Sequence, residues 1–492
     1  MNTIKQVWLR SALLALVVAP LAAIAAVQEI PITTKSADAR LAFDAGQAAL
    51  DRGDAAEAND LFRAAVVADP KFTYAWVNLS NVTFSTEEFN AALRGGEQGA
   101  AQASEGERIL LEFNKHFLDN DFSAQLALAG QLTEKYPNSP RAWLVLAGAH
   151  GALNQFAQQR ALLEQVIALA PNFSVAPFTL GASYLFNQPK DFAQAEKYYR
   201  QAVALAPGTD MYYWSLGDVY RGSNKLEEAR RYYQLALKLD PKDQTAPVKL
   251  GHVDSFLGKY DEARKDYDRG IEAGGPANAG FLAPFKALTW VYQGQPAVAI
   301  KALESLVTDI DGFGAAPDQR LNAKIAALTN AALIALFSGM NDDAARILAA
   351  RTALMRENAK VVGTGAFSKI QETQIAFFDG QLAAWRGDFK TAGAQAKKVA
   401  ELVAGENNDR KLEPYHELSG LIALRQKNYR KAISEYRLAD LTQLHNKYQL
   451  AQALEATMGI DEAKKLYKDV AENNFNTVDF ALLRSEAMKK AG

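Results

Sequence analysis

The chain has 492 residues, of which 22% are charged and 49% hydrophobic, and a formal net charge of −2, as is typical of a soluble folded protein. It contains no cysteine, which excludes disulfides, cysteine zinc sites and lipid attachment at a cysteine. It also has no block of Lys and Arg of the kind that binding to nucleic acid or to an anionic membrane requires.

The first residues resemble an export signal. Lys5 and Arg10 precede an uncharged, apolar run over residues 11–27 that ends in small side chains. This order predicts a secretory signal peptide over residues 1–25, and the alternative is an uncleaved anchor. Both place the rest of the chain outside the cytoplasm, and the bacterial type of leader predicts the periplasm. We expect no other stretch to be long and apolar enough to span a membrane.

A repeated pattern follows, and it is clearest in residues 210–242 and 244–273, which align almost position for position. Each stretch has two sets of apolar and small residues with the spacing of one helix face, separated by a short polar break. In the first stretch these residues are Tyr213, Leu216, Gly217 and Tyr220, then Ala229, Tyr233 and Ala236, with Pro241 at the end. In the second they are Leu250, Gly251, Gly258, Tyr260, Ala263 and Tyr267. A period of about 34 residues predicts a solenoid of helical hairpins.

These positions resemble those of the tetratricopeptide repeat. Further copies are found at residues 40–70, 73–104, 106–137, 140–171, 174–207, 282–308, 325–353, 373–402, 413–441 and 444–473. The copies at 106–137, 282–308 and 325–353 depart most from the pattern and are also compatible with another kind of helical hairpin. The resemblance implies an all-α fold, an α-solenoid in which about twelve helix-turn-helix repeats form a right-handed superhelix.

The regularity of the repeats changes along the chain. We expect a regular N-terminal solenoid over residues 28–272 and a looser C-terminal solenoid over residues 273–475. The reason is that longer connections rich in Gly, Pro, Asn or Asp are predicted at Ala273–Ala283, Asp309–Gln319, Asn358–Ser368 and Ala404–Glu413. Two arrangements remain open: a bend or hinge between the halves, or one continuous superhelix with longer loops.

Residues 476–492 follow the last repeat as a cap or tail. Phe475, Phe480, Leu482 and Leu483 provide apolar side chains to cover the exposed face of the last hairpin, which every solenoid end needs. The alternative is a separate binding peptide.

Catalytic and metal-binding motifs are absent from the sequence. It has no H-E-x-x-H, G-x-S-x-G or Walker loop, and its five histidines lack metal-ligand spacing. The D-x-D-G at Asp309–Gly312 lacks the rest of a calcium loop and predicts a turn. We therefore expect no enzyme activity, no metal and no cofactor.

The candidate binding residues come from the resemblance, which places first helices on the inner, concave face. The matching positions are Phe178, Phe186, Trp214, Asp218, Arg221, Lys249, His252, Phe256 and Trp290. Aromatic side chains supply buried area to a bound peptide, and charges orient it. The alternative is that some of these side chains pack between helices.

The expected function is a protein–protein interaction scaffold or adaptor of the bacterial cell envelope. Its partner would be another envelope protein or peptide segment, bound in the concave groove, with no nucleic acid and no stable membrane insertion after signal cleavage. The alternative is a groove that binds a small molecule, a glycan or a cell-wall fragment, and a third reading is an enzyme with an unrecognised site.

Overall fold

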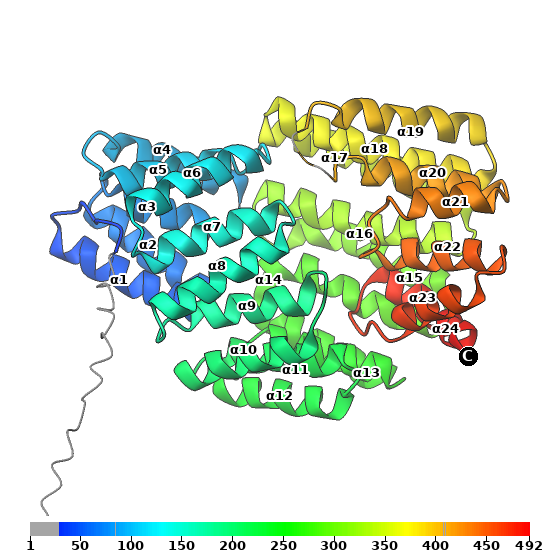
Figure 1. Cartoon of the computed structure of the whole chain (residues 1–492), viewed down its shortest axis with the longest axis horizontal. Coiled ribbons are helices and arrows are strands. Elements are labelled where there is room, and N and C mark those ends of the chain that lie inside the picture. Colours follow the sequence, from blue (N-terminus) through cyan, green and yellow to red (C-terminus); the bar gives the residue numbers. More distant parts are fainter. Residues whose placement is uncertain (1–28, 84, 407, 409) are drawn as a thin grey trace, which may run out of the picture.

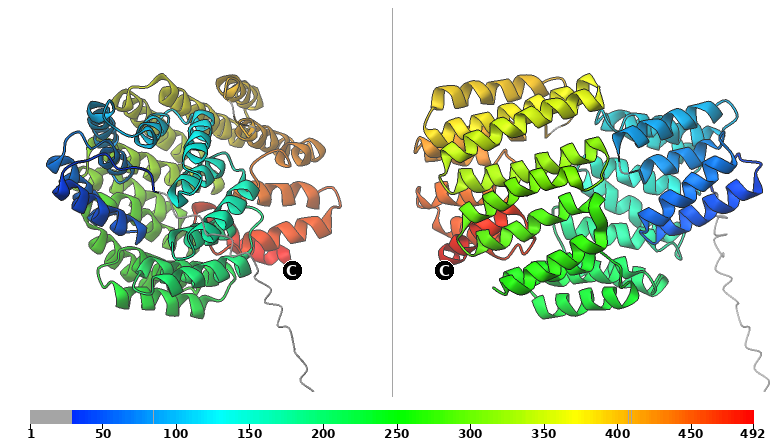
Figure 2. Two further views of the ribbon diagram at one scale, coloured as in Figure 1. Left: turned by 60° about the vertical axis from the view of Figure 1, so that its left-hand side comes forward. Right: turned by 180° about the vertical axis from the view of Figure 1, so that it is seen from behind.

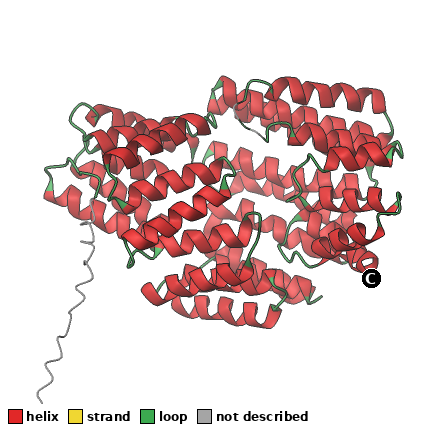
Figure 3. Cartoon of the chain, viewed as in Figure 1, coloured by secondary structure: helices red, strands yellow, loops and turns green. Residues whose placement is uncertain are grey.

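The computed structural model of the chain describes residues 29–492 apart from 84, 407 and 409. In this part of the chain the regular secondary structure is helical throughout, with 24 α-helices, one short 3₁₀-helix and no strand (Figure 3). The all-α prediction is therefore confirmed. The predicted signal peptide lies outside the described residues and stays a prediction.

The helices form twelve successive antiparallel pairs and a final single helix, the number of repeats that the sequence predicts (Figure 1). The first six pairs are α1 (Ala37–Asp51) with α2 (Ala55–Ala68), α3 (Thr73–Asn81) with α4 (Thr86–Gly99), α5 (Glu105–Lys115) with α6 (Phe122–Lys135), α7 (Pro140–Ala152) with α8 (Phe156–Leu169), α9 (Val175–Phe186) with α10 (Phe192–Leu205), and α11 (Asp210–Gly222) with α12 (Leu226–Leu239).

In the second six pairs one helix is shared, because the long helix α14 (Tyr260–Tyr292) contributes to two hairpins. They are α13 (Thr245–Phe256) with the first part of α14, the last part of α14 with α15 (Pro296–Asp309), α16 (Pro317–Phe337) with α17 (Asn341–Val362), α18 (Gly365–Arg386) with α19 (Phe389–Val403), α20 (Glu413–Arg425) with α21 (Tyr429–Tyr436), and α22 (Leu444–Glu455) with α23 (Ile460–Ala471). The 3₁₀-helix η1 (Ile310–Gly312) follows α15, and α24 (Val478–Ala491) ends the chain.

Within a hairpin, a glycine on the first helix faces a large ring on the second. A Cβ atom added to Gly251 would lie 2.7 Å from the ring of Tyr267, and one added to Gly181 would lie 2.9 Å from that of Tyr199. The same relation holds for Gly46 with Phe62, Gly217 with Tyr233 and Gly420 with Tyr436. All five rings are almost completely buried, so the small residue sets how closely the two helices approach.

Two of the predicted long connections are not loops. Residues 273–283 are helical and belong to α14, whose backbone leaves helical geometry only at Gly275, with φ of 65°. Residues 358–362 continue α17, and only Gly363 and Thr364 separate that helix from α18. Glycine permits these sharp changes of direction because it adopts positive φ without steric cost. The stacking of α12, α13, α14 and α15 therefore continues past residue 273 without a gap.

Helix α16 differs from expectation in composition. By length and hydropathy it is apolar enough to cross a membrane, contrary to the prediction that only the leader has this property. Half of its apolar stretch is buried inside the protein, and the helix packs against α14, α15, α17 and α24. Its apolar character is thus accounted for by its place in the core of the C-terminal half.

The solenoid curls tightly enough for distant repeats to touch (Figure 2). Near the N-terminus, Asp51 of α1 pairs with Arg141 of α7 at 2.6 Å, and its carbonyl oxygen accepts a hydrogen bond from the Tyr212 hydroxyl of α11 at 3.3 Å. At the other end, α24 packs on α22 and α23 and also on α14 and α16. The last helix therefore covers the end of the solenoid and at the same time contacts its middle.

Candidate functional site

The candidate site is the face formed by α9, α11, α13 and α14, which is occupied by the chain's own C-terminal segment. We use this name for residues 473–480, which comprise the link between α23 and α24 and the start of α24. Three of the four supporting helices are first helices of their hairpins, the helices that the sequence predicts to line the concave face. The segment is thus bound where a partner segment is expected.

Phe475 is the first anchor of the segment. Its ring and that of Phe186 form a T-shaped pair with a centroid distance of 5.6 Å. The guanidinium of Arg221 lies 4.9 Å from the centroid of the Phe475 ring, and the ammonium of Lys190 lies 4.7 Å from it. Burial, and next to it the charge of Lys447, lowers the pKa of Lys190 to about 8. The aromatic ring therefore lies in a pocket formed by one ring and two cations, which its negative faces attract.

Asn476 is the second anchor and is buried. Its side-chain nitrogen donates to Nδ1 of His252 and to the hydroxyl of Tyr267, both at 3.0 Å. Its side-chain oxygen accepts from the hydroxyl of Tyr292 at 2.7 Å. Burial, followed by the charges of Arg221 and Lys249, holds the pKa of His252 well below its usual value. His252 is therefore neutral and its Nδ1 accepts the amide proton.

Two further contacts extend the attachment in both directions. Before the anchors, the side-chain nitrogen of Asn474 donates to the side-chain oxygen of Asn224, in the turn after α11, at 2.9 Å. After them, the ring of Phe480 packs edge-on against Phe256 at 5.2 Å. The Arg484 side chain covers both of these rings and donates to the Phe256 carbonyl oxygen at 3.1 Å.

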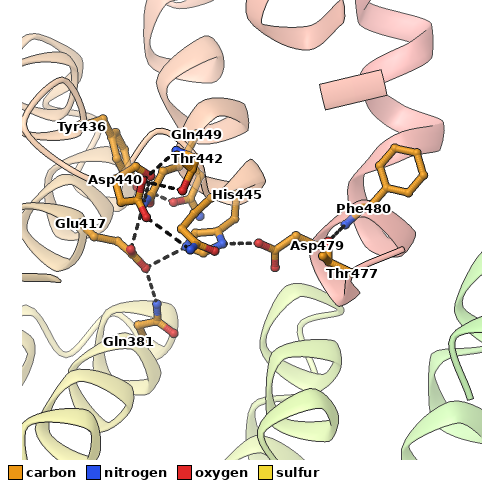
Figure 4. A network of polar contacts seen from close by, with 12 residues as sticks. Gln381, Glu417, Tyr436, Asp440, Thr442, His445, Gln449, Thr477, Asp479 and Phe480 are labelled. Atoms are coloured by element: carbon orange, nitrogen blue, oxygen red, sulfur yellow. Dashed lines mark hydrogen bonds and ion pairs between the residues drawn. The ribbon is translucent and has the colours of Figure 1, made fainter. Parts of the chain in front are cut away.

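A buried ionic network holds the start of α24 from the other side (Figure 4). His445 of α22 is bonded through Nδ1 to Asp479 at 2.6 Å and through Nε2 to Glu417 of α20 at 2.8 Å. Asn446 and Gln381 also donate to the Glu417 carboxylate. Burial alone would lower the pKa of His445, but Asp479 and Glu417 outweigh it and raise that pKa well above its usual value. The imidazole is therefore a cation between two carboxylates.

Four of the nine predicted binding residues touch the C-terminal segment or α24: Phe186, Arg221, His252 and Phe256. The sequence predicts an open groove at these side chains, and the structure places the chain's own segment there instead. Only Phe186 among the four remains widely accessible, with 46% of its surface exposed. Binding of a partner by these residues stays a prediction.

The other five predicted residues have their main contacts elsewhere, within and between the repeats. Asp218 is completely buried and accepts from Lys249 at 2.6 Å, and from Arg221 and Tyr233 at 2.8 Å. Burial alone would raise the pKa of Asp218, but the charges of Lys249 and Arg221 hold it below its usual value. Asp218 therefore lies in the interior of this structure, and its predicted role in partner binding stays a prediction.

The aromatic members of this group have packing roles. Phe178 lies between the rings of Tyr199 and Tyr212, with centroid distances of 5.5 and 5.1 Å. The Lys249 ammonium lies 5.0 Å from the centroid of the Trp214 ring, and the Arg264 guanidinium lies 5.3 Å from the centroid of the Trp290 ring. Phe178 therefore packs between helices while staying partly exposed, and its role as a groove residue stays a prediction.

Several residues of the site were not predicted from the sequence. They are Lys190, Asn224, Tyr267, Tyr292, Asn474, Asn476 and Arg484. Phe475 and Phe480 were expected to cover the last hairpin or, in the alternative, to belong to a separate binding peptide. The one signal available was the run Asn473–Thr477, in which three asparagines surround an aromatic residue.

The segment also forms one wall of a cavity of about 350 Å³. The other walls come from α14 and α16, which contribute Phe281, Phe285 and Asn330, and from Gln443. The inner face is therefore not filled completely by the C-terminal segment.

Comparison with known proteins identifies the repeats. A family model described as tetratricopeptide repeat matches residues 20–107 and 188–244. The chain contains tetratricopeptide repeats. The second matched range covers α10, α11 and α12, including Arg221, and begins just after α9. No curated protein matches the sequence significantly.

Several solved structures are similar to parts of this chain. MamA residues 41 to the end, from Desulfovibrio magneticus RS-1, is 20% identical, with a TM-score of 0.30 over 35% of this chain and 96% of that one. TTC0263, a thermophilic protein of the same repeat class in Thermus thermophilus, is 20% identical, with a TM-score of 0.31 over 34% of this chain and 91% of that one. A chain of the Cut9–Hcn1 hetero-tetramer of APC/C is 16% identical, with a TM-score of 0.40 over 87% of this chain and 75% of that one.

Proposed function

We propose that this protein is an interaction scaffold of the bacterial cell envelope that binds an extended segment of a partner protein on the face formed by α9, α11, α13 and α14. The observation that supports the proposal is the bound C-terminal segment. This face holds a stretch of polypeptide by side-chain contacts: a ring in an aromatic and cationic pocket, and an amide whose nitrogen and oxygen are both bonded.

The envelope location is the second part of the proposal, and it rests on the leader of residues 1–25. The test is to recover the protein from the periplasmic fraction of its host and to determine the N-terminal sequence of the mature form. Cleavage after Ala25 or Ala26 supports the proposal. A full-length protein in the cytoplasmic fraction would contradict this part of it.

Site-specific photocrosslinking in the host tests partner binding. A photoreactive amino acid replaces Phe186 in one variant and Leu239 of α12 in a control, because the two side chains are similarly exposed, at 46% and 44%. We expect the residue at 186 to crosslink to an envelope protein and mass spectrometry to place the crosslink in an extended segment of it. If position 186 reacts only within the chain, or reacts with the same proteins as position 239, the proposed binding face is wrong.

A further inference from the structure

The contacts of the C-terminal segment define what kind of sequence this face recognises. The Phe475 pocket presents two cations and one aromatic ring in a T-shaped arrangement, so it favours an electron-rich aromatic ring over an aliphatic side chain. Gly222 contributes to the fit, because a Cβ atom there would lie 3.3 Å from the Phe475 ring and 2.7 Å from that of Phe192. This position is therefore specific for an aromatic residue.

The next position is specific for asparagine. His252 offers an acceptor at Nδ1, while the Tyr292 hydroxyl donates, so the bound side chain must both donate and accept. An amide meets both demands, whereas a carboxylate has no proton to give to His252. The site is also buried, and a side chain that left these groups unpaired would cost binding free energy. Glutamine carries the same amide one methylene farther out.

The segment is held on this face by hydrogen bonds to helices that are far away in the sequence from its own hairpin. Asn476 reaches His252 across 224 positions of the sequence, and Asn474 reaches Asn224 across 250. The link between α23 and α24 is short, from Glu472 to Thr477, so release of the segment requires α24 or the last hairpins to move with it. The face is thus either occupied by the chain itself or open to another chain.

We propose that the C-terminal segment is an internal occupant of the partner-binding face, and that a partner replaces it by presenting an extended segment in which an aromatic residue is followed directly by asparagine. This inference rests on the proposed function, because it names the class of partner that the same face accepts. The chain's own segment competes as an intramolecular ligand, and its release also requires α24 or the last hairpins to move. A partner therefore binds with reduced apparent affinity until the segment is released.

The test uses a fluorescein-labelled peptide with the sequence of residues 470–479, VAENNFNTVD, and the mature protein. Since the chain has no cysteine, Asn224→Cys and Asn474→Cys introduce two unique thiols at side chains that touch each other. A short, cleavable bismaleimide then holds the segment in place, and reduction of the linker releases it. The two single-cysteine variants, treated with the same reagent, are the controls.

We expect the released protein to bind the peptide at least tenfold more tightly than the linked protein, as measured by fluorescence anisotropy. A peptide with alanine at both anchor positions should not bind measurably, and a peptide with aspartate in place of the anchor asparagine should bind at least tenfold more weakly than the parent peptide. Equal binding to the linked and released forms, equal binding of the three peptides, or no binding of the parent peptide would each overturn the proposal.

A second variant separates competition from a purely structural role. Phe475→Ala in the protein weakens the internal occupant without altering the pocket, so it should increase the affinity for the parent peptide at least threefold. A residue with only a packing role would leave the affinity unchanged or lower it. If the peptide binds as expected but crosslinking in the host identifies no partner, the proposed function fails and the exchange on this face stands. If crosslinking in the host identifies a partner but the peptide does not bind, the proposed function stands and the exchange on this face is wrong.

Discussion

Two histidines hold the C-terminal segment, and they do so in opposite charge states. His252 is neutral and accepts a hydrogen bond from Asn476 beside the Tyr267 hydroxyl. His445 is a cation and bonds Asp479 and Glu417. The residues that they hold, Asn476 and Asp479, are close neighbours in the sequence. The environment alone decides the difference, because cations lie near the first histidine and carboxylates touch the second.

The comparison shows that the two attachments respond to different changes. The His252 side depends on the matching of donors and acceptors, where loss of one group leaves neutral partners unpaired. The His445 side depends on charge balance in the interior, where loss of one group leaves charges without a counter-ion. We therefore expect the second side to contribute more to stability and the first to contribute more to selectivity.

The largest effect is expected from His445→Ala. It leaves the carboxylates of Glu417 and Asp479 buried without their cation, and removal of one member of such a network costs about 3–5 kcal/mol of unfolding free energy. Urea unfolding followed by circular dichroism measures this difference. The matched control is His416→Ala, which removes a more exposed histidine paired with Glu435 at 2.8 Å. For this variant we expect a loss of about 1 kcal/mol or less. Equal losses of unfolding free energy in the two variants would show that the buried network contributes no more to stability than the more exposed pair.

An intermediate effect is expected from Asn476→Ala. The variant leaves the Tyr292 hydroxyl and His252 Nδ1 without one hydrogen-bond partner each, at a cost of about 1–3 kcal/mol. Asn473→Ala is the control, since the Asn473 side chain accepts a backbone hydrogen bond from Phe475 at the longer distance of 3.3 Å. Hydrogen exchange should show faster opening of α13 and α24 in the Asn476 variant alone. Unchanged exchange in both helices would mean that the amide does not hold the segment.

The smallest effects are expected from pH, because each histidine then exchanges a proton and keeps its side chain. The pKa of folded His252 is lowered, so its contribution is present above the unfolded pKa of about 6.5 and is lost as the pH falls below it. The pKa of folded His445 is raised, so its contribution is present below about 6.5 and is lost as the pH rises through the raised value. Asp479, with a lowered pKa, loses its contribution only in stronger acid.

Glutamine variants of the two histidines separate these contributions. The difference in unfolding free energy between the wild type and His252→Gln should grow from about pH 5 to about pH 7. The difference between the wild type and His445→Gln should shrink as the pH rises above about 7. Urea unfolding at each pH measures both. Two differences that change with pH in the same direction would contradict the assignment of the charge states.

The sequence predicts the hairpins well because their determinants are local. Gly217 and Tyr233 belong to one repeat, and their contact fixes how two neighbouring helices cross. The pattern of small and large residues therefore contains the information for each unit and its neighbour. It fails at residues 273–283, where a stretch rich in glycine and alanine reads as a loop, although only Gly275 leaves helical geometry.

The candidate site is harder to predict, because it depends on how far the stack turns. The sequence identifies Phe186, Arg221, His252 and Phe256 as residues of one face, but not that residues 473–480 would occupy it. A small rotation between successive repeats accumulates over the chain and decides whether α24 meets α13 or misses it. No single repeat contains that information. The pairing of buried Asp218 with Lys249 is also missed, because it depends on how one repeat packs on the next.

The bond between Asn476 and His252 also bears on how the protein folds. An open array of repeats is built from local contacts and can start to fold anywhere, whereas this contact joins residues 224 positions apart and raises the contact order of the chain. The hairpins between α13 and α24 then no longer unfold one by one from an end, since the final helix ties them to the centre in a single cooperative unit. We expect the last stretch of the polypeptide to be the one that completes folding.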